Sequence, residues 1–281
     1  MSTFGARLQA AVAARGPLCV GVDPHEHLLR EWGLDATAHG AREFGLRVIE
    51  ACVDRVAVIK PQVSFFERYG SAGIAALEEV LSSARAAGLL TIADAKRGDI
   101  GSTMDAYARA WLSQGSPLEA DALTVNPYLG VGALDSTMRF AMEVGKGLFV
   151  LAATSNPEAG TLQRARRDDG LTVASGIISE VSDFAAGHTA VSTWSSIGFV
   201  IGATVEVNAF DLPETIEPIA PILSPGFGHQ GAGLTEVESR FGPLAKSVLV
   251  SESRGILAAG PGGLVRAIDE RRVILQETRS A

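Results

Sequence analysis

The 281-residue sequence predicts an α/β protein with one domain over residues 1–281, folded as a closed (β/α)8 barrel of the TIM type. Eight short apolar runs recur along the chain, and segments with helical periodicity separate them. Runs that are apolar at nearly every position are typical of parallel strands buried on both faces. The first run ends in Asp23-Pro24-His25, without the glycine-rich turn that a dinucleotide-binding open sheet usually carries there.

The strands and helices alternate in order along the chain. The predicted strands are Pro17–Asp23, Val56–Lys60, Leu89–Lys96, Ala122–Pro127, Gly147–Thr154, Ile197–Thr204, Pro221–Gly226 and Ser247–Ser253. The predicted helices lie around residues 37–52, 67–87, 102–113, 132–144, 171–186, 209–219, 235–245 and 263–272. Eight such pairs fit a closed barrel, which commonly uses about 250 residues for a single domain.

A short helix precedes the first predicted strand. Phe4, Leu8 and Val12 recur at helical spacing, Ser2 or Thr3 can cap the helix, and Gly16-Pro17 ends it. The first 16 residues contain two arginines and no acid, which faintly resembles a transit peptide. We favour the interpretation that this segment is a helix covering the floor of the barrel.

The overall charge narrows the classes of partner. A formal net charge of −8 argues against binding to nucleic acid or to an anionic membrane surface, although a local site can still be positive.

No apolar run reaches the roughly 18 residues that a membrane span needs. The two cysteines, Cys19 and Cys52, lie in apolar stretches and predict neither a disulfide framework nor a zinc site. We therefore expect a cytoplasmic protein.

Charged and polar residues stand where the predicted strands end, which is where such barrels place reactive groups. One charge there could be a solvated strand end, but several converging charges indicate a site. The residues concerned are Asp23, Lys60, Asp94 with Lys96, Asn126, Ser155, Thr204, the loop 225–231 and Ser253-Arg254.

The end of the third predicted strand is the most informative part of this set. Because side chains alternate along a strand, Asp94 and Lys96 are expected on the same side, toward the barrel mouth. A neighbouring carboxylate favours the charged form of a lysine. Such a lysine suits delivery of a proton to a carbanion and suits a Schiff-base nucleophile poorly. Lys60, which ends the preceding strand, can extend the alternation of charge.

The pattern Asp94-x-Lys96-x-x-Asp99-Ile100-x-x-Thr103 resembles the signature of the orotidine 5′-phosphate decarboxylase family. Asp23, Lys60 and Arg254 match further elements, and the loop Pro225-Gly-Phe-Gly-His-Gln-Gly231 matches that family's glycine-rich loop. These elements occur in the family's order across nearly the whole chain. The length resembles the longer bacterial branch of the family.

The resemblance implies decarboxylation of orotidine 5′-monophosphate to UMP, without a metal or an organic cofactor. Lys96 would protonate C6 of the pyrimidine as carbon dioxide leaves, and Asp94 would hold Lys96 beside the substrate carboxylate. Lys60 and Asp23 would contact the ribose hydroxyls. In a barrel, the loop after the seventh strand and the end of the eighth often bind phosphate, which agrees with this implication.

The resemblance also implies a homodimer with shared active sites. Asp99 and Thr103 would reach the ribose in the partner subunit's site. Ser155 would bond the pyrimidine edge, and Gln230 would bridge the base and the phosphate. Arg254 and backbone N–H groups near Gly255 would hold the phosphate, for which arginine offers a bidentate fork.

Two alternative functions remain from different classes. A metal-dependent sugar-phosphate decarboxylase or an aldolase-like synthase of the same suprafamily would resemble this chain in Asp-x-Lys-x-x-Asp. Such an enzyme should supply a metal-binding acid where Lys60 stands, which disfavours it. A non-catalytic phosphate sensor should lack one of the charged residues, and none is missing. The roles of Asn126, His25 and His229 stay open, as does the conformation of residues 155–190.

Overall fold

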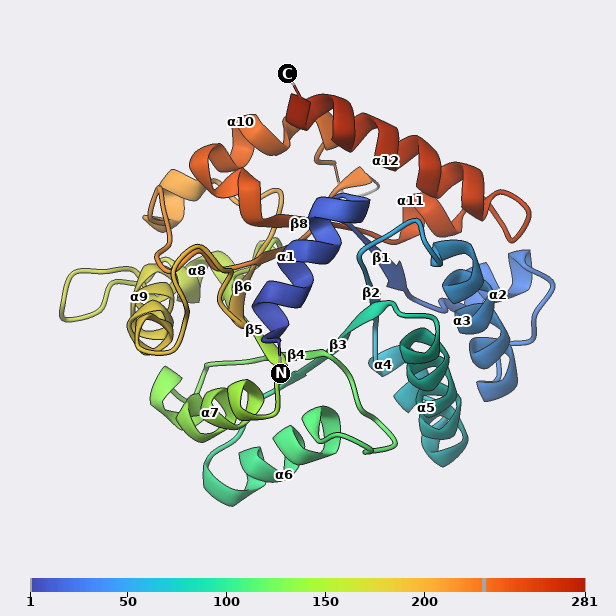
Figure 1. Ribbon diagram of the computed structural model, residues 1–281, viewed down its shortest axis with the longest axis horizontal. Coiled ribbons are helices and arrows are strands. Elements are labelled where there is room, and N and C mark those ends of the chain that lie inside the picture. The colour runs from blue at the N-terminus through green and yellow to red at the C-terminus, as the bar shows by residue number, and fades with distance from the viewer. Residues whose placement is uncertain (1, 229–230, 281) are drawn as a thin grey trace.

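The computed structural model describes residues 2–228 and 231–280. Eight parallel strands form a closed barrel in the order β1 to β8, and β8 pairs with β1. Helices surround the strands, and the N-terminal helix crosses one end of the barrel (Figure 1). The predicted (β/α)8 architecture is confirmed.

All eight predicted strands are present, each one to three residues shorter or shifted at its ends. Their bounds are β1 Leu18–Val22, β2 Val58–Pro61, β3 Leu90–Arg97, β4 Ala122–Val125, β5 Gly147–Ala153, β6 Ile197–Ile201, β7 Ile222–Pro225 and β8 Val248–Glu252. Most of their residues are buried on both faces, because one face lines the barrel interior and the other packs under the helices. This double burial is why the strands are nearly uniformly apolar in sequence.

Six of the predicted helices form as long outer helices. They are α3 Ala38–Cys52, α5 Gly70–Ala86, α6 Gly101–Leu112, α7 Asp135–Glu143, α9 Val173–Ala186 and α12 Leu264–Ser280. The predicted helix around 235–245 is reduced to α10 Val237–Phe241 between two 3₁₀ turns. Four short helices were not predicted: α2 Glu26–Glu31, α4 Ser64–Glu67, α8 Ala159–Gln163 and α11 Arg254–Leu257.

The prediction of a helix around residues 209–219 was wrong. Only a 3₁₀ turn forms there, over Val207–Phe210, and the chain then leaves the helical region at Asp211 with φ 48°. Pro213 and Pro218 follow, and a proline inside a helix removes a hydrogen-bond donor and clashes with the preceding turn. The apolar spacing reflects instead the burial of side chains such as Leu212 and Ile216 against the barrel.

The N-terminal helix α1, Phe4–Arg15, covers the amino-terminal end of the barrel as predicted. The Thr3 side chain accepts a hydrogen bond from the N–H of Ala6, and Gly16, at φ 85°, ends the helix. Phe4 is fully buried and meets the Phe149 ring edge-on at 6.2 Å.

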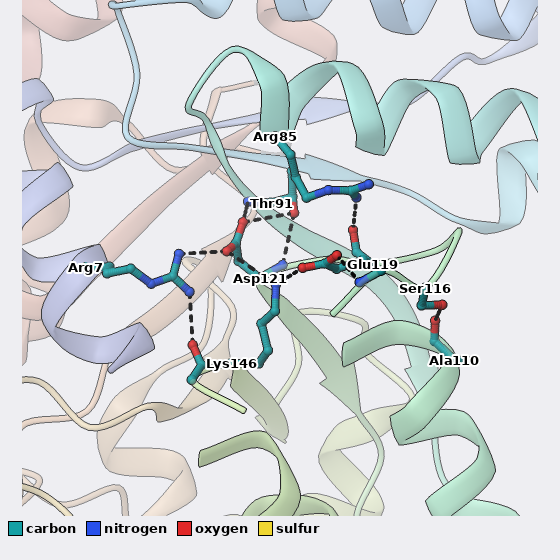
Figure 2. Close-up of polar contacts among 10 residues, drawn as sticks. Arg7, Arg85, Thr91, Ala110, Ser116, Glu119, Asp121 and Lys146 are labelled. Atoms are coloured by element: carbon teal, nitrogen blue, oxygen red, sulfur yellow. Dashed lines mark hydrogen bonds and ion pairs between the residues drawn. The ribbon is translucent and has the colours of Figure 1, made fainter. Parts of the chain in front are cut away.

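A network of polar contacts fixes α1 to this floor (Figure 2). Arg7 of α1 donates to a carboxylate oxygen of Asp121 at 2.8 Å, just before β4, and the same carboxylate accepts from Thr91 of β3. Lys146, just before β5, bonds Glu119 at 2.7 Å. The floor is therefore closed by ion pairs as well as by apolar packing.

Among the residues that the structure describes, no helix is both long enough and apolar enough to cross a membrane.

Candidate active site

A cavity of about 590 Å³ opens at the carboxyl-terminal ends of the strands. Five of the predicted charged residues line it, although they come from four different strand ends. They are Asp23 after β1, Lys60 in β2, Asp94 and Lys96 in β3, and Arg254 after β8. The fold thus brings groups separated by more than 200 residues of sequence to one surface.

Three of these side chains form a line of alternating charge. The Nζ of Lys96 lies 2.6 Å from Oδ1 of Asp94, and the Nζ of Lys60 lies 3.0 Å from Oδ2 of the same carboxylate. Asp94 and Lys60 are buried, whereas the Lys96 side chain is 47% exposed. Asp94 therefore uses both oxygens to hold two ammonium groups, and the Lys96 ammonium is the more exposed of the two.

Burial and charge act in opposite directions on this network. Burial alone would raise the pKa of the Asp94 carboxyl, but Lys60 and Lys96 outweigh it and hold that pKa well below its usual range. Burial alone would lower the pKa of the Lys60 ammonium, but Asp94 and Asp23 outweigh it and raise that pKa above its ordinary value. Both groups therefore stay charged at neutral pH despite their burial.

Asp23 presents an unused acceptor. Its Oδ1 is buried and has no hydrogen-bond partner within the described ranges. A Cβ at the neighbouring Gly21 would lie 3.3 Å from this oxygen and 2.6 Å from the Cβ of Ser253, so glycine leaves the space that both side chains occupy. A buried acceptor without a donor is costly, and it suits a ligand that brings a hydroxyl group.

The backbone at Lys96 departs from the simple alternation that the sequence suggested. Ala93 pairs with Leu123 and Arg97 pairs with Val125, so residues 94–96 of β3 lie opposite one residue of β4. Lys96 has φ 49°, in the left-handed region that residues other than glycine seldom adopt. Asp94 and Lys96 still meet, but through this bulge and not through a regular strand.

Arg254, after β8, lines the same cavity as Pro225, the last residue of β7, and Gly226, which follows it. In the described part of the chain, the Arg254 guanidinium forms no hydrogen bond or ion pair. The nearby buried carboxylate of Glu252 is bound instead by Arg271, at 3.1 Å. Arg254 is therefore free to bind an anion in the cavity.

Glu252 supports this end of the site, and the sequence reasoning missed it. An added Cβ would approach its Oε1 to 2.6 Å at Gly228 and to 2.2 Å at Gly255. Both glycines thus pack directly on the Glu252 carboxylate, which links the loop after β7 to the start of α11. An acid at the end of an apolar strand was the available signal, but the pairing with Arg271 of α12 could not be read from spacing.

The remaining predicted residues are distributed differently. Ser155 lines the cavity and is exposed. Asp99 and Thr103 do not line it; Asp99 accepts a hydrogen bond from the N–H of Ile100, and Thr103 is exposed on α6. Gly255 lies in α11, also outside the lining. Gln230 and His229 lie outside the described residues.

The structure places two residues and one segment that the sequence left unassigned. Asn126 lines the cavity, but its Oδ1 accepts from the N–H of Tyr128 and so also shapes the loop after β4. His25 lies outside the lining and packs on Phe65 with ring centroids 4.2 Å apart. The segment 155–190 contains the short helix α8 and the longer helix α9. Within residues 2–228 and 231–280, no three His, Cys, Asp or Glu side chains are grouped as metal ligands.

Comparison with known proteins gives concordant results. A model of the orotidine 5′-phosphate decarboxylase / HUMPS family matches residues 16–265. The orotidine 5′-phosphate decarboxylase of Salinispora arenicola is 50% identical over 282 residues, covering 100% of this chain and 99% of that protein. The protein of the same name from Streptomyces coelicolor is 49% identical over 262 residues, covering 93% and 92%. The crystal structure of a Streptomyces avermitilis protein is 45% identical, covers 100% of this chain and 97% of that chain, and has a TM-score of 0.94.

Proposed function

The chain belongs to the orotidine 5′-phosphate decarboxylase / HUMPS family, and we infer that it decarboxylates orotidine 5′-monophosphate to UMP, the last step of de novo pyrimidine nucleotide synthesis. The observation that carries the chemistry is the Lys60–Asp94–Lys96 line of charge at the cavity. It supplies an accessible ammonium beside a fixed carboxylate, which is what protonation of a carbanion requires.

The proposed reaction uses no electron sink. The bond between C6 and the carboxylate carbon breaks, the electron pair stays on C6, and carbon dioxide leaves. Lys96 donates a proton from Nζ to C6 and regains one from solvent after UMP departs. Fixed charge lowers the barrier because the ammonium already points to where negative charge develops. Asp94 keeps Lys96 in place and stands beside the substrate carboxylate, which adds repulsion in the ground state.

We propose binding roles for five further residues, of which Asp23, Lys60, Ser155 and Arg254 line the cavity. Asp23 and Lys60 are proposed to bind the ribose hydroxyls, since Asp23 has a free acceptor oxygen. Ser155 is proposed to bond the pyrimidine edge, and Gln230 to bridge the base and the phosphate. Arg254 and the backbone near Gly255 are proposed to hold the phosphate, whose binding energy can stabilise the site during the reaction.

We also propose the homodimer with shared sites. Asp99 and Thr103 are not among the residues that line the cavity of their own subunit, and the exposed apolar side chains of Ile100, Tyr128 and Leu129 follow β3 and β4 in sequence. Burial of those side chains against a second copy would carry Asp99 into the partner's cavity. The cytoplasm is the proposed compartment, since Cys19 and Cys52 are buried free thiols.

The first prediction tests the activity and the cofactor requirement together. The absorbance of orotidine 5′-monophosphate should fall at the same rate when purified protein is added before or after exhaustive treatment with EDTA. The physical reason is that the Lys60 ammonium occupies the end of β2, where it would repel a cation. A chelated sample that loses turnover and recovers it with magnesium would instead favour the metal-dependent alternative.

The second prediction concerns the phosphate. Arg254→Ala should weaken UMP binding by about 1.5–3 kcal/mol, as expected for a lost charge-assisted hydrogen bond. Isothermal titration calorimetry measures the change. Arg266→Ala is the matched control, since that side chain is 86% exposed on α12 and, among the described residues, forms an ion pair only with Glu270. Equal UMP affinity in the Arg254→Ala variant and the wild type would remove Arg254 from the phosphate site.

A further inference from the structure

The bulge in β3 leaves the Lys96 backbone without a regular partner on β4. Between the pairs Ala93–Leu123 and Arg97–Val125, Thr124 alone faces residues 94–96. The N–H of Lys96 donates to the Oγ1 of Thr124 at 2.9 Å. A side-chain hydroxyl therefore takes the place of a backbone acceptor at the residue whose side chain supplies the ammonium.

The same hydroxyl also holds the carboxylate. Because Oγ1 of Thr124 accepts from the Lys96 N–H, its own proton is free to donate, and it does so to Oδ1 of Asp94 at 3.0 Å. That oxygen also accepts from the Nζ of Lys96 at 2.6 Å. Thr124 thus ties together the backbone of Lys96 and the carboxylate that holds the other end of the same lysine.

Thr124 does not itself face the cavity. Thr124 is only 1% exposed, and it is not among the residues that line the cavity. Any effect of Thr124 on the reaction therefore acts through Asp94 and Lys96 and not through contact with the substrate.

We propose that Thr124 is a positioning residue, which keeps the Lys96 backbone in its left-handed conformation and so aims the Lys96 ammonium at C6. This inference rests on the proposed function. Without the hydroxyl, the partly buried Lys96 N–H loses its acceptor, and the backbone at φ 49° loses the contact that offsets its strain. The bulge then shifts toward a regular strand, and the ammonium moves with it.

The test compares three threonine variants. Thr124→Val removes the hydroxyl with little change of volume, and Thr124→Ser keeps the hydroxyl. Thr91→Val is the matched control: Thr91 lies in β3, the strand that contains Lys96, and its hydroxyl likewise bonds a carboxylate and a backbone N–H, those of Asp121 (Figure 2). Thr91 is at the barrel floor, however, far from Lys96. Decarboxylation kinetics, UMP binding and unfolding midpoints are measured for each.

The expected pattern separates positioning from stability. Thr124→Val should lower kcat by on the order of 10–100-fold, because a misplacement of about 1 Å can cost about 100-fold. Its Kd for UMP should change by less than about threefold, since phosphate and ribose contacts lie elsewhere. Thr124→Ser should restore most of kcat. Thr91→Val should lower the unfolding midpoint and leave kcat unchanged.

Several results would overturn the inference. They are a Thr124→Val variant with wild-type kcat, a loss of kcat that Thr124→Ser does not restore, and an equal loss of kcat in Thr91→Val. If Thr124→Val does not fold, Thr124→Ala removes the same hydroxyl in a smaller side chain and is judged by the same criteria. A wild-type protein without decarboxylase activity would instead overturn the proposed function, so the two failures are distinguishable.

Discussion

Replacement of Lys96 by alanine is expected to abolish decarboxylation while the protein stays folded and still binds UMP. Lys96 is proposed both to donate the proton and to place positive charge beside C6. General acid catalysis contributes about 10²–10⁴-fold, and the loss of one stabilising group costs about 10²–10³-fold. A fall in kcat of about 10⁴-fold or more is therefore expected. Binding should persist, because Arg254 and Asp23 lie elsewhere in the cavity.

Lys246→Ala is the matched control for this variant. Lys246 is an exposed lysine in the 3₁₀ turn before β8, remote from the cavity, and its loss should change neither kcat nor UMP binding. Circular dichroism checks that both variants fold. A Lys96→Ala variant that keeps near-normal turnover would remove the proton-donor role from Lys96.

Mixing two inactive variants is expected to recover activity if the active sites are shared between subunits. Lys96→Ala and Asp99→Ala homodimers should each be nearly inactive. Co-refolding them in equal amounts gives hybrids in about half of the dimers, and each hybrid contains one site with both residues intact and one site with neither. Activity should then recover to about a quarter of the wild-type level, by the symmetry of a two-fold dimer.

The structure supplies a negative control for the mixing experiment. Asp94 and Lys96 contact each other within one subunit, at 2.6 Å. A mixture of Lys96→Ala with Asp94→Asn therefore leaves every site with at least one altered residue, and it should recover nothing. Native mass spectrometry confirms that hybrids form. Hybrids of Lys96→Ala and Asp99→Ala that stay as inactive as the separate variants would refute the cross-subunit role of Asp99.

The strands could be predicted from the sequence because double burial makes them apolar at almost every position. The long helices could be predicted because one apolar stripe faces the barrel. The helices α2, α4, α8 and α11 could not, since four to six residues are too few to show a helical period. The segment 209–219 mimicked such a period, but its prolines prevent a helix.

Some residues of the candidate site could likewise be predicted from the sequence, and others could not. Charged residues at the ends of apolar runs identified Asp23, Lys60, Asp94, Lys96 and Arg254, because a charge after a buried strand is conspicuous. Thr124 was not conspicuous, since threonine is common in strands and its role depends on the bulge in β3. Gly255 and Gly228 gain their meaning only from the buried Glu252 carboxylate. The proposed contact of Asp99 with a ribose would depend on a second chain, which spacing within one sequence does not define.

Exchange of the C6 proton of UMP with solvent deuterium tests the central claim most directly, namely that Lys96 moves the proton at C6. A group that protonates the C6 carbanion must also remove that proton in the reverse direction, without any need for carbon dioxide. Proton NMR of UMP in D₂O should therefore show loss of the C6 proton signal with the wild-type protein and none with Lys96→Ala. Exchange at the wild-type rate in a folded, UMP-binding Lys96→Ala variant would contradict the account.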